Sequence, residues 1–226
     1  MTQFTGFTPQ TIDFLWELRM NNHKAFMEEN RQRYQTVLKE PFDCLTKELI
    51  QRIEEIGKGM PRQASISRIN RDIRFSKDKS PYRPKRWMVL HDGKQAGTDW
   101  KCQPVFYFEL TPEAYYTGMG LYDSTPAFLQ AYRRKIDADT AAFLRIANGL
   151  KRAKELTADG ESYKRQMGNG AHAPLVELWY QKKEITISEE RPIDELLFSD
   201  KLCDHVLAEW KKMVPLFRFL REVSVG

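Results

Sequence analysis

The sequence predicts an α+β fold with helices at the N-terminus, a central antiparallel sheet and helices at the C-terminus. Apolar residues recur at helical spacing in the first sixty residues and again after residue 125. Between these regions, runs rich in Val, Phe, Tyr and Trp alternate with Gly, Pro and Asp turn signals, which is typical of antiparallel strands. No linker, repeat or low-complexity tract divides the chain, so residues 1–226 are expected to form one domain.

The N-terminal part predicts three antiparallel helices, over residues 9–20, 22–40 and 41–56. Thr8 is expected to cap the first helix and Asn22 the second, because a short polar side chain accepts from the free N–H groups of the first turn. The second helix is expected to end at Glu40, since the residue before a proline (Pro41) disfavours helical backbone.

The central part predicts strands over residues 86–91, 104–110 and 114–120, and a further strand over 184–188. Gly118 and Gly120 lack the third glycine of a dinucleotide-binding loop and favour a tight turn. Residues 67–82 fit a helix and a strand equally well by periodicity, because each template misplaces one side chain. The β-branched residues with Asn, Asp and Ser between them favour an extended segment that runs into a turn at 77–81.

The C-terminal part predicts helices again. Thr125 is expected to cap a helix that begins at Pro126, and Asp139 to restart a second one. A short helix around 175–179 follows a long loop or irregular hairpin over 157–173. Ser199 is expected to cap a last helix, which Pro215 must kink or restart.

The positive charge of the chain is concentrated in one stretch. Residues 67–86 contain eight Lys or Arg against two Asp, a local charge of +6, whereas the whole chain carries +5. Such a stretch suits anionic partners, either a phosphate-bearing small molecule or nucleic acid. The chain contains no apolar run near the roughly 20 residues that cross a bilayer, so no membrane partner is expected.

This stretch also carries a family resemblance. The segment from Ser67 to Tyr82 reads SRINRDIRFSKDKSPY, and further matching pieces are Asn21-Asn22, Glu29-Asn30-Arg31-x-x-Tyr34, Gly118-x-Gly120-Leu-Tyr122, Arg133 with Ile136, Lys182-Lys183 and Pro215-Leu216-x-x-Phe219-Leu220. With these pieces the chain resembles the bacterial domain-of-unknown-function family 2461 over nearly its whole length. The resemblance implies a single-domain, soluble bacterial protein and no established activity. Arg83-Pro84-Lys85-Arg86 departs from the usual family pattern.

The ligand-binding hypothesis is an anion clamp. In an extended segment, alternate residues project from one face about 6–7 Å apart, so Arg68, Asn70, Asp72 and Arg74 would share a face. Arginine suits phosphate and carboxylate because its planar fork of donors stays charged. The predicted ligand-binding residues are Arg68, Asn70, Arg71, Arg74, Lys77, Lys79 and Tyr82. Tyr82, Trp87, Tyr115 and Tyr116 are also candidates for stacking on nucleic-acid bases.

Two alternatives stay open. The chain would be a hydrolase- or transferase-type enzyme on a phosphorylated substrate if Asp72 or Asp78 served as general base or Mg²⁺ ligand. It would be a structural or interaction protein if the stretch were an internal polar brace. The brace reading predicts that Asp72→Ala destabilises the fold strongly, because breaking a buried charged network is costly.

Cysteines and histidines add little. Cys44, Cys102 and Cys203 lie far apart without a Cys-x-x-Cys pair, and the N-terminus lacks the regions of a signal peptide, so a cytoplasmic location is expected. The histidines lack the i, i+4 spacing of a helical metal pair. No metal site is predicted, although a set of His91, Cys102 and His172 stays open. The sequence indicates no cofactor and no oligomeric state.

Overall fold

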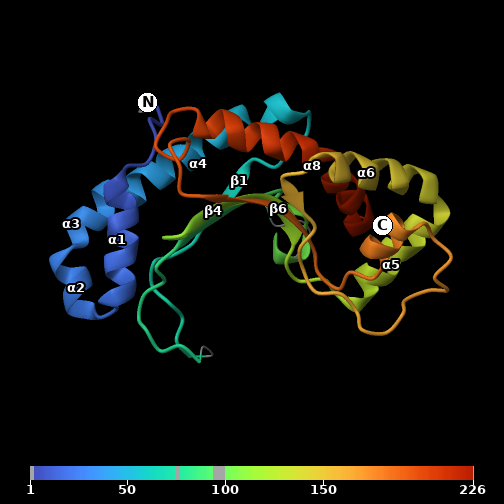
Figure 1. Cartoon of the computed structure of the whole chain (residues 1–226), viewed down its shortest axis with the longest axis horizontal. Helices are drawn as coiled ribbons and strands as arrows, with labels where there is room; N and C mark the ends of the chain where they lie inside the picture. The colour runs from blue at the N-terminus through green and yellow to red at the C-terminus, as the bar shows by residue number, and fades with distance from the viewer. Residues whose placement is uncertain (1–2, 75–76, 94–99, 226) are drawn as a thin grey trace.

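The computed structural model describes residues 3–74, 77–93 and 100–225 (Figure 1). It confirms the α+β fold, because helices at both ends of the chain flank a six-stranded antiparallel sheet in the part described. Over these residues, no helix combines the length and the apolar character that crossing a membrane requires.

The sheet has the strand order β1-β2-β3-β4-β6-β5, with every neighbouring pair antiparallel. Its strands are β1 (Gln63–Ile66), β2 (Arg86–His91), β3 (Val105–Leu110), β4 (Ala114–Leu121), β5 (Leu156–Thr157) and β6 (Ile185–Pro192). The four predicted strands are all present, and β6 runs four residues further than predicted. The short strands β1 and β5 were not predicted, because four and two residues are too few to show a period.

The helices of the described residues are α1 (Pro9–Met20), α2 (Lys24–Glu29), α3 (Arg31–Arg33), the π-helix η1 (Tyr34–Lys39), α4 (Glu40–Arg52), the 3-10 segments η2 (Ile53–Ile56) and η3 (Trp100–Cys102), α5 (Pro126–Ala138), α6 (Thr140–Arg152), α7 (Pro174–Tyr180) and α8 (Leu202–Val225). In Figure 1, α4 and α8 lie along one face of a curved sheet. The helices α1 to α3 lie beyond one end of the sheet, and α5 and α6 lie beyond the other end (Figure 1).

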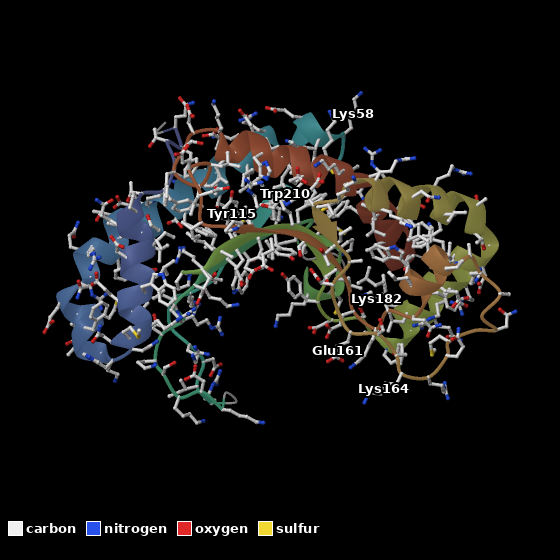
Figure 2. All side chains as sticks on the ribbon, viewed as in Figure 1. Lys58, Tyr115, Glu161, Lys164, Lys182 and Trp210 are labelled. Atoms are coloured by element: carbon white, nitrogen blue, oxygen red, sulfur yellow. The ribbon has the colours of Figure 1, made fainter. Side chains whose placement is uncertain are left out.

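The main core lies between α8 and the sheet. The ring of Phe106 on β3 stacks on Phe217 at 4.6 Å between centroids and lies 5.3 Å from Trp210, and both partners belong to α8. Trp210 and Tyr115 of β4 project into this layer (Figure 2) and are fully buried. Pro215 lies inside α8, and the ribbon turns toward α5 in its C-terminal part (Figure 1).

The predicted helix end at Glu40 is wrong. The helix α3, η1 and α4 follow one another from Arg31 to Arg52 without a break. Pro41 has no N–H to give to the carbonyl of Val37, four residues earlier. The buried hydroxyl of Thr11 donates to that carbonyl instead, at 2.6 Å. The π-helical turns of η1 end directly before Glu40, so local widening and a tertiary hydrogen bond carry the helix through the proline.

Three smaller predictions are also corrected. His23, not Asn22, caps α2, and its Nδ1 accepts from the N–H of Phe26 at 3.2 Å. Ser199 does not cap α8, because its hydroxyl donates to the carbonyl of Leu196 at 3.0 Å and the helix begins at Leu202.

Gly118 and Gly120 lie inside β4 rather than in a tight turn. A Cβ atom on Gly118 would come within 2.7 Å of the ring of Tyr107. The cross-strand tyrosine therefore requires a glycine there. By contrast, the predicted caps Thr125 and Asp139 are confirmed, since their side chains accept from Phe128 N and Ala142 N.

Candidate functional site

The described residues of the basic stretch, 67–74 and 77–86, form an arm that connects β1 to β2 and extends away from the sheet beside α1 to α3 (Figure 1). Its two sides pair at the start. The N–H of Arg71 donates to the carbonyl of Pro81, and the N–H of Arg83 donates to that of Ile69, both at 2.8 Å. The described part of the stretch contains no helix, and Asn70 and Tyr82 form an isolated antiparallel bridge, so strand-like pairing is present at the start of the arm. Below, residues 67–71 and 81–86 are the arm root and residues 72–80 the arm tip.

The arm root is fastened to the body of the protein. Ile69 and Tyr82 are each 7% exposed and belong to the core cluster. The side-chain amide of Asn22, in the turn between α1 and α2, donates to the carbonyl of Tyr82 and accepts from its N–H, each at 3.0 Å. One side chain therefore satisfies both backbone groups of Tyr82, which explains why Asn22 is not free to cap α2.

A pocket of about 340 Å³ lies between the arm root and the helical segment 27–39. Arg31 and Lys39 line it from the helical side, and Arg68 and Arg86 from the arm side and β2. Gln35, Ser67 and Asn70 add further polar groups, and no carboxylate is among the lining residues. We call this the basic pocket.

Arg86 is the most constrained cation of the basic pocket. It is 5% exposed, and its guanidinium lies 5.3 Å from the ring centroid of Phe42. Its Nη1 donates to the hydroxyl of Tyr34 and its Nη2 to Oδ1 of Asp43, each at 3.0 Å. Its buried Nε has no hydrogen-bond partner among the residues described. A buried N–H of a charged group normally has a partner.

Of the other three cations, one is paired with a described residue and two are not. Lys39 shares the carboxylate of Asp43 with Arg86, at 2.7 Å. Arg31 and Arg68 are exposed, and neither has an ion pair within the described part of the chain. Four positive side chains thus face the basic pocket and one carboxylate, that of Asp43, balances two of them. The pocket therefore carries an excess of positive charge and free N–H donors.

The structure gathers only some of the predicted ligand-binding residues. Arg68, Asn70 and Tyr82 line the basic pocket. Arg71 is half-buried and pairs with Asp78 at 2.9 Å. The remaining predicted residues, Arg74, Lys77 and Lys79, lie exposed in the arm tip.

The predicted clamp of Arg68, Asn70, Asp72 and Arg74 does not form one unit. The first two face the basic pocket, whereas Asp72 and Arg74 are exposed and bind each other through two hydrogen bonds of 2.9 and 2.6 Å. Lys79 donates to the carbonyl of Ile73 at 2.9 Å, within the arm tip. The exposure of Asp72 removes the basis for the expected strong destabilisation by Asp72→Ala, because that cost applies to a buried network.

Asp72 and Asp78 are poorly suited to general base catalysis. The side chain and the backbone N–H of Arg74 hold the pKa of Asp72 down to about 2. Hydrogen bonds from the backbone and side chain of Ser80 lower the pKa of Asp78. A weak base in an exposed loop takes up protons inefficiently near neutral pH. Neither carboxylate lines the basic pocket.

The brace reading fits Arg86 best, because Arg86 is buried and joins Tyr34 and Asp43. The residues expected to stack on nucleic-acid bases differ in how exposed their side chains are. Tyr115 is fully buried and donates to Asp194 at 3.0 Å, so it cannot stack on a base. Trp87 and Tyr116 are half-buried.

His91, Cys102 and His172 do not come together as a possible metal group within the described residues.

Sequence reasoning missed Arg31, Gln35 and Lys39. These residues recur every four positions, so they lie near one another along one side of a helix. That polar stripe, on a segment whose Asn30-Arg31 belongs to the family resemblance, was the available signal.

Comparison with known families gives one match. The family model described as "Conserved hypothetical protein (DUF2461)" matches residues 10–219 of the chain. Among curated proteins, no similar sequence was found. The match spans the helices, the sheet and the basic pocket, and its description names no activity.

Proposed function

Because the chain belongs to the DUF2461 family of conserved hypothetical proteins, we propose a function from its geometry: it binds a small phosphorylated or otherwise anionic ligand in the basic pocket. The observation that supports this most is the set of donors there. Arg86 keeps a buried Nε–H without a partner among the described residues, and Arg31 and Arg68 have no described ion pair. Hydrogen bonds between arginine and phosphate or carboxylate oxygens are roughly twice as strong as neutral ones.

The dimensions favour a small ligand. A volume of about 340 Å³ lies at the lower end of the range of small-molecule sites, roughly 300–1,000 Å³. The ring of Tyr34 and the side chains of Met27 and Ile66 give the pocket an apolar part beside its charged part. A phosphate attached to a small organic group matches this combination of donors and apolar surface.

The proposal is tested by thermal unfolding with a panel of inorganic phosphate, nucleotides, sugar phosphates and short oligonucleotides. A ligand present at a hundred times its Kd stabilises the folded state by about 2.7 kcal/mol. For a chain of this length, that raises Tm by roughly 5–10 °C. We expect at least one phosphate class to give such a shift, and the shift to shrink as salt screens the charges.

Two double variants locate the site. Arg31→Gln with Arg68→Gln removes two charges from the basic pocket, and Arg74→Gln with Lys77→Gln removes two from the arm tip. We expect the first pair to abolish the ligand shift and the second to keep it. If no compound shifts the wild type, or if the pocket variant shifts as far as the wild type, the proposal is wrong. A shift with oligonucleotides that only the arm-tip variant loses would instead assign the arm to nucleic acid.

A further inference from the structure

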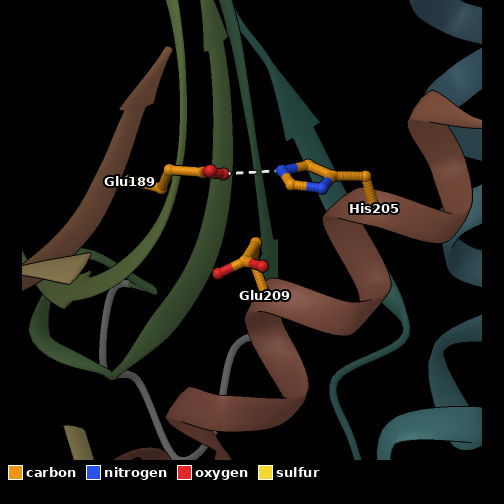
Figure 3. A group of neighbouring side chains, drawn as sticks. All are labelled: Glu189, His205 and Glu209. Atoms are coloured by element: carbon orange, nitrogen blue, oxygen red, sulfur yellow. Dashed lines mark hydrogen bonds and ion pairs between the residues drawn. The ribbon is translucent and has the colours of Figure 1, made fainter. Parts of the chain in front are cut away.

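A second group of polar side chains lies on the sheet face that α8 covers. Glu189 lies on β6, and His205 and Glu209 lie on α8 (Figure 3). Residues four apart on a helix lie on the same face, so His205 and Glu209 both point toward Glu189. One ligand atom from each of the three side chains lies within 4.8 Å of the other two.

The spacing suits a shared cation. Ligand atoms about 2.1 Å from a transition-metal ion lie roughly 3.4 Å apart in a tetrahedral arrangement and about 4.2 Å apart when opposite each other. Nε2 of His205 already lies 2.6 Å from Oε2 of Glu189. The carboxylate of Glu209 lies beside the line that joins these two atoms (Figure 3). To reach the tetrahedral spacing, the pair of His205 and Glu189 has to open by about 0.8 Å and the Glu209 oxygen has to approach by up to about 1.4 Å, which side-chain rotations can supply.

The second observation is an unpartnered buried oxygen. Glu209 is 4% exposed, and its Oε2 has no hydrogen-bond partner among the residues that the structure describes. Its other oxygen, Oε1, accepts from Lys212 at 2.6 Å. Burying a carboxylate oxygen without a donor is costly. A cation between the three side chains would satisfy it.

The surrounding charges leave this region negative. Lys212, which neutralises Glu209, is shared with Glu155. Arg191, which lies 3.3 Å from Glu189, makes its shorter contact of 2.6 Å with Asp194. Four carboxylates thus share two permanent cations and one histidine, and a divalent ion would offset the difference.

From this arrangement we infer that Glu189, His205 and Glu209 bind one divalent first-row transition-metal ion. An imidazole with two carboxylates suits Zn²⁺, Mn²⁺ or Fe²⁺, whereas Mg²⁺ and Ca²⁺ prefer oxygen ligands alone. The ligands come from a strand and a helix, which hold them more firmly than loops would. Both carboxylates are covered, and the side chain of His205 is 20% exposed, so the ion enters past the imidazole.

The test is a titration of chelator-treated protein with Zn²⁺, Mn²⁺, Co²⁺ and Mg²⁺, followed by calorimetry and thermal unfolding. We expect one ion per chain, a rise in Tm with the transition metals, and at least about a hundredfold weaker binding of Mg²⁺. Bound Co²⁺ should show a visible absorption band that differs from that of the aqueous ion.

Three variants assign the ligands. Glu209→Gln and His205→Gln each remove one ligand, and each is expected to weaken Zn²⁺ binding at least tenfold and to change the Co²⁺ band. Glu155→Gln is the matched control, because Glu155 also pairs with Lys212 but lies outside the group. It removes one nearby charge but no ligand, so it should weaken Zn²⁺ binding less than either ligand variant and leave the Co²⁺ band unchanged. The inference is overturned if the wild type binds no transition metal with a stoichiometry of one, or if His205→Gln binds it unchanged. Since His205 is partly exposed, that variant decides the question even if Glu209→Gln does not fold.

Discussion

The root and the tip of the arm differ both in net charge and in their surroundings. In the root, Tyr82 and Arg86 are buried and Arg68 faces the basic pocket without a described ion pair. In the tip both carboxylates are paired, because Asp72 binds Arg74 and Asp78 pairs with Arg71 of the root. The root carries five Lys or Arg and no acidic residue in eleven residues, whereas the tip carries three Lys or Arg against two Asp in nine. Residues of the root line the basic pocket together with the helical segment 27–39, and none of the described tip residues is among the lining residues.

The difference shows what turns a basic stretch into a candidate site. Exposed charges are hydrated and bind weakly to any single partner. A cation with a covered N–H, such as Arg86, has lost water from that donor and gains more from an anion that reaches it. The proposed metal site of Glu189, His205 and Glu209 (the metal group) follows the same rule for a cation. Among the residues described, the basic pocket holds an unpartnered N–H of Arg86, and the metal group holds an unpartnered carboxylate oxygen of Glu209.

The largest expected effect is on stability at the arm root. Arg86→Met keeps an apolar stem against Phe42 and removes the charge that pairs with Asp43 and Tyr34. Breaking a buried ion pair costs about 3–5 kcal/mol, and Lys39 still faces Asp43, so we expect a loss of roughly 2–3 kcal/mol in the free energy of unfolding. Urea denaturation measures it.

Arg68→Met is the control for this prediction, because Arg68 lines the same pocket but is exposed. Its substitution should change the free energy of unfolding by less than about 0.5 kcal/mol. Equal losses for Arg68→Met and Arg86→Met would show that burial does not separate the two arginines.

A smaller effect is expected where the root is fastened. Asn22→Ala removes the donor and the acceptor that hold the backbone of Tyr82. The N–H of Tyr82 then loses its partner and its carbonyl keeps only the long contact of 3.5 Å from Arg71, which together costs about 2 kcal/mol. The neighbouring Asn21→Ala serves as control, since the Asn21 side chain is exposed and donates only to the carbonyl of Glu17. Hydrogen exchange of the Tyr82 amide should accelerate in the first variant alone.

The sequence predicted the fold better than the site. Helices and strands with clear periods were found within a few residues, because burial on one face leaves a repeat in the chain. The errors lie where tertiary contacts replace local rules. Thr11 supplies the hydrogen bond that lets the helix continue past Pro41. The backbone of Tyr82 binds the side-chain amide of Asn22, which was expected to cap α2. Neither partner is near in sequence.

Contacts between residues far apart in sequence limited the prediction of the candidate sites even more. Arg68, Asn70 and Tyr82, three of the predicted ligand-binding residues, line one pocket, since the two sides of the arm pair beside it. Arg31 and Lys39 reach the basic pocket from a helix more than twenty residues away. For the metal group, the sequence search considered pairs of histidines at i, i+4 and not His205 with Glu209, and nothing local indicated Glu189 as the third member.

The smallest expected effect concerns the arm tip, where hydrogen bonds from the side chain and backbone of Arg74 lower the pKa of Asp72 to about 2. A carboxyl group whose pKa is lower in the folded than in the unfolded chain stabilises the fold above its unfolded pKa of about 3.9, and this contribution disappears as pH falls toward 2. Here the contribution to stability should be too small to measure, because both side chains are exposed and their attraction is screened by water.

Carboxyl NMR titration of the wild type should give an Asp72 pKa near 2, and Arg74→Gln should raise that pKa toward its ordinary value. In the same experiments Asp72→Ala should leave the urea midpoint at neutral pH unchanged. If instead Asp72→Ala lowered the midpoint as far as Asn22→Ala does, the arm tip would be bound to the body of the protein in solution, and the contrast between root and tip would fail.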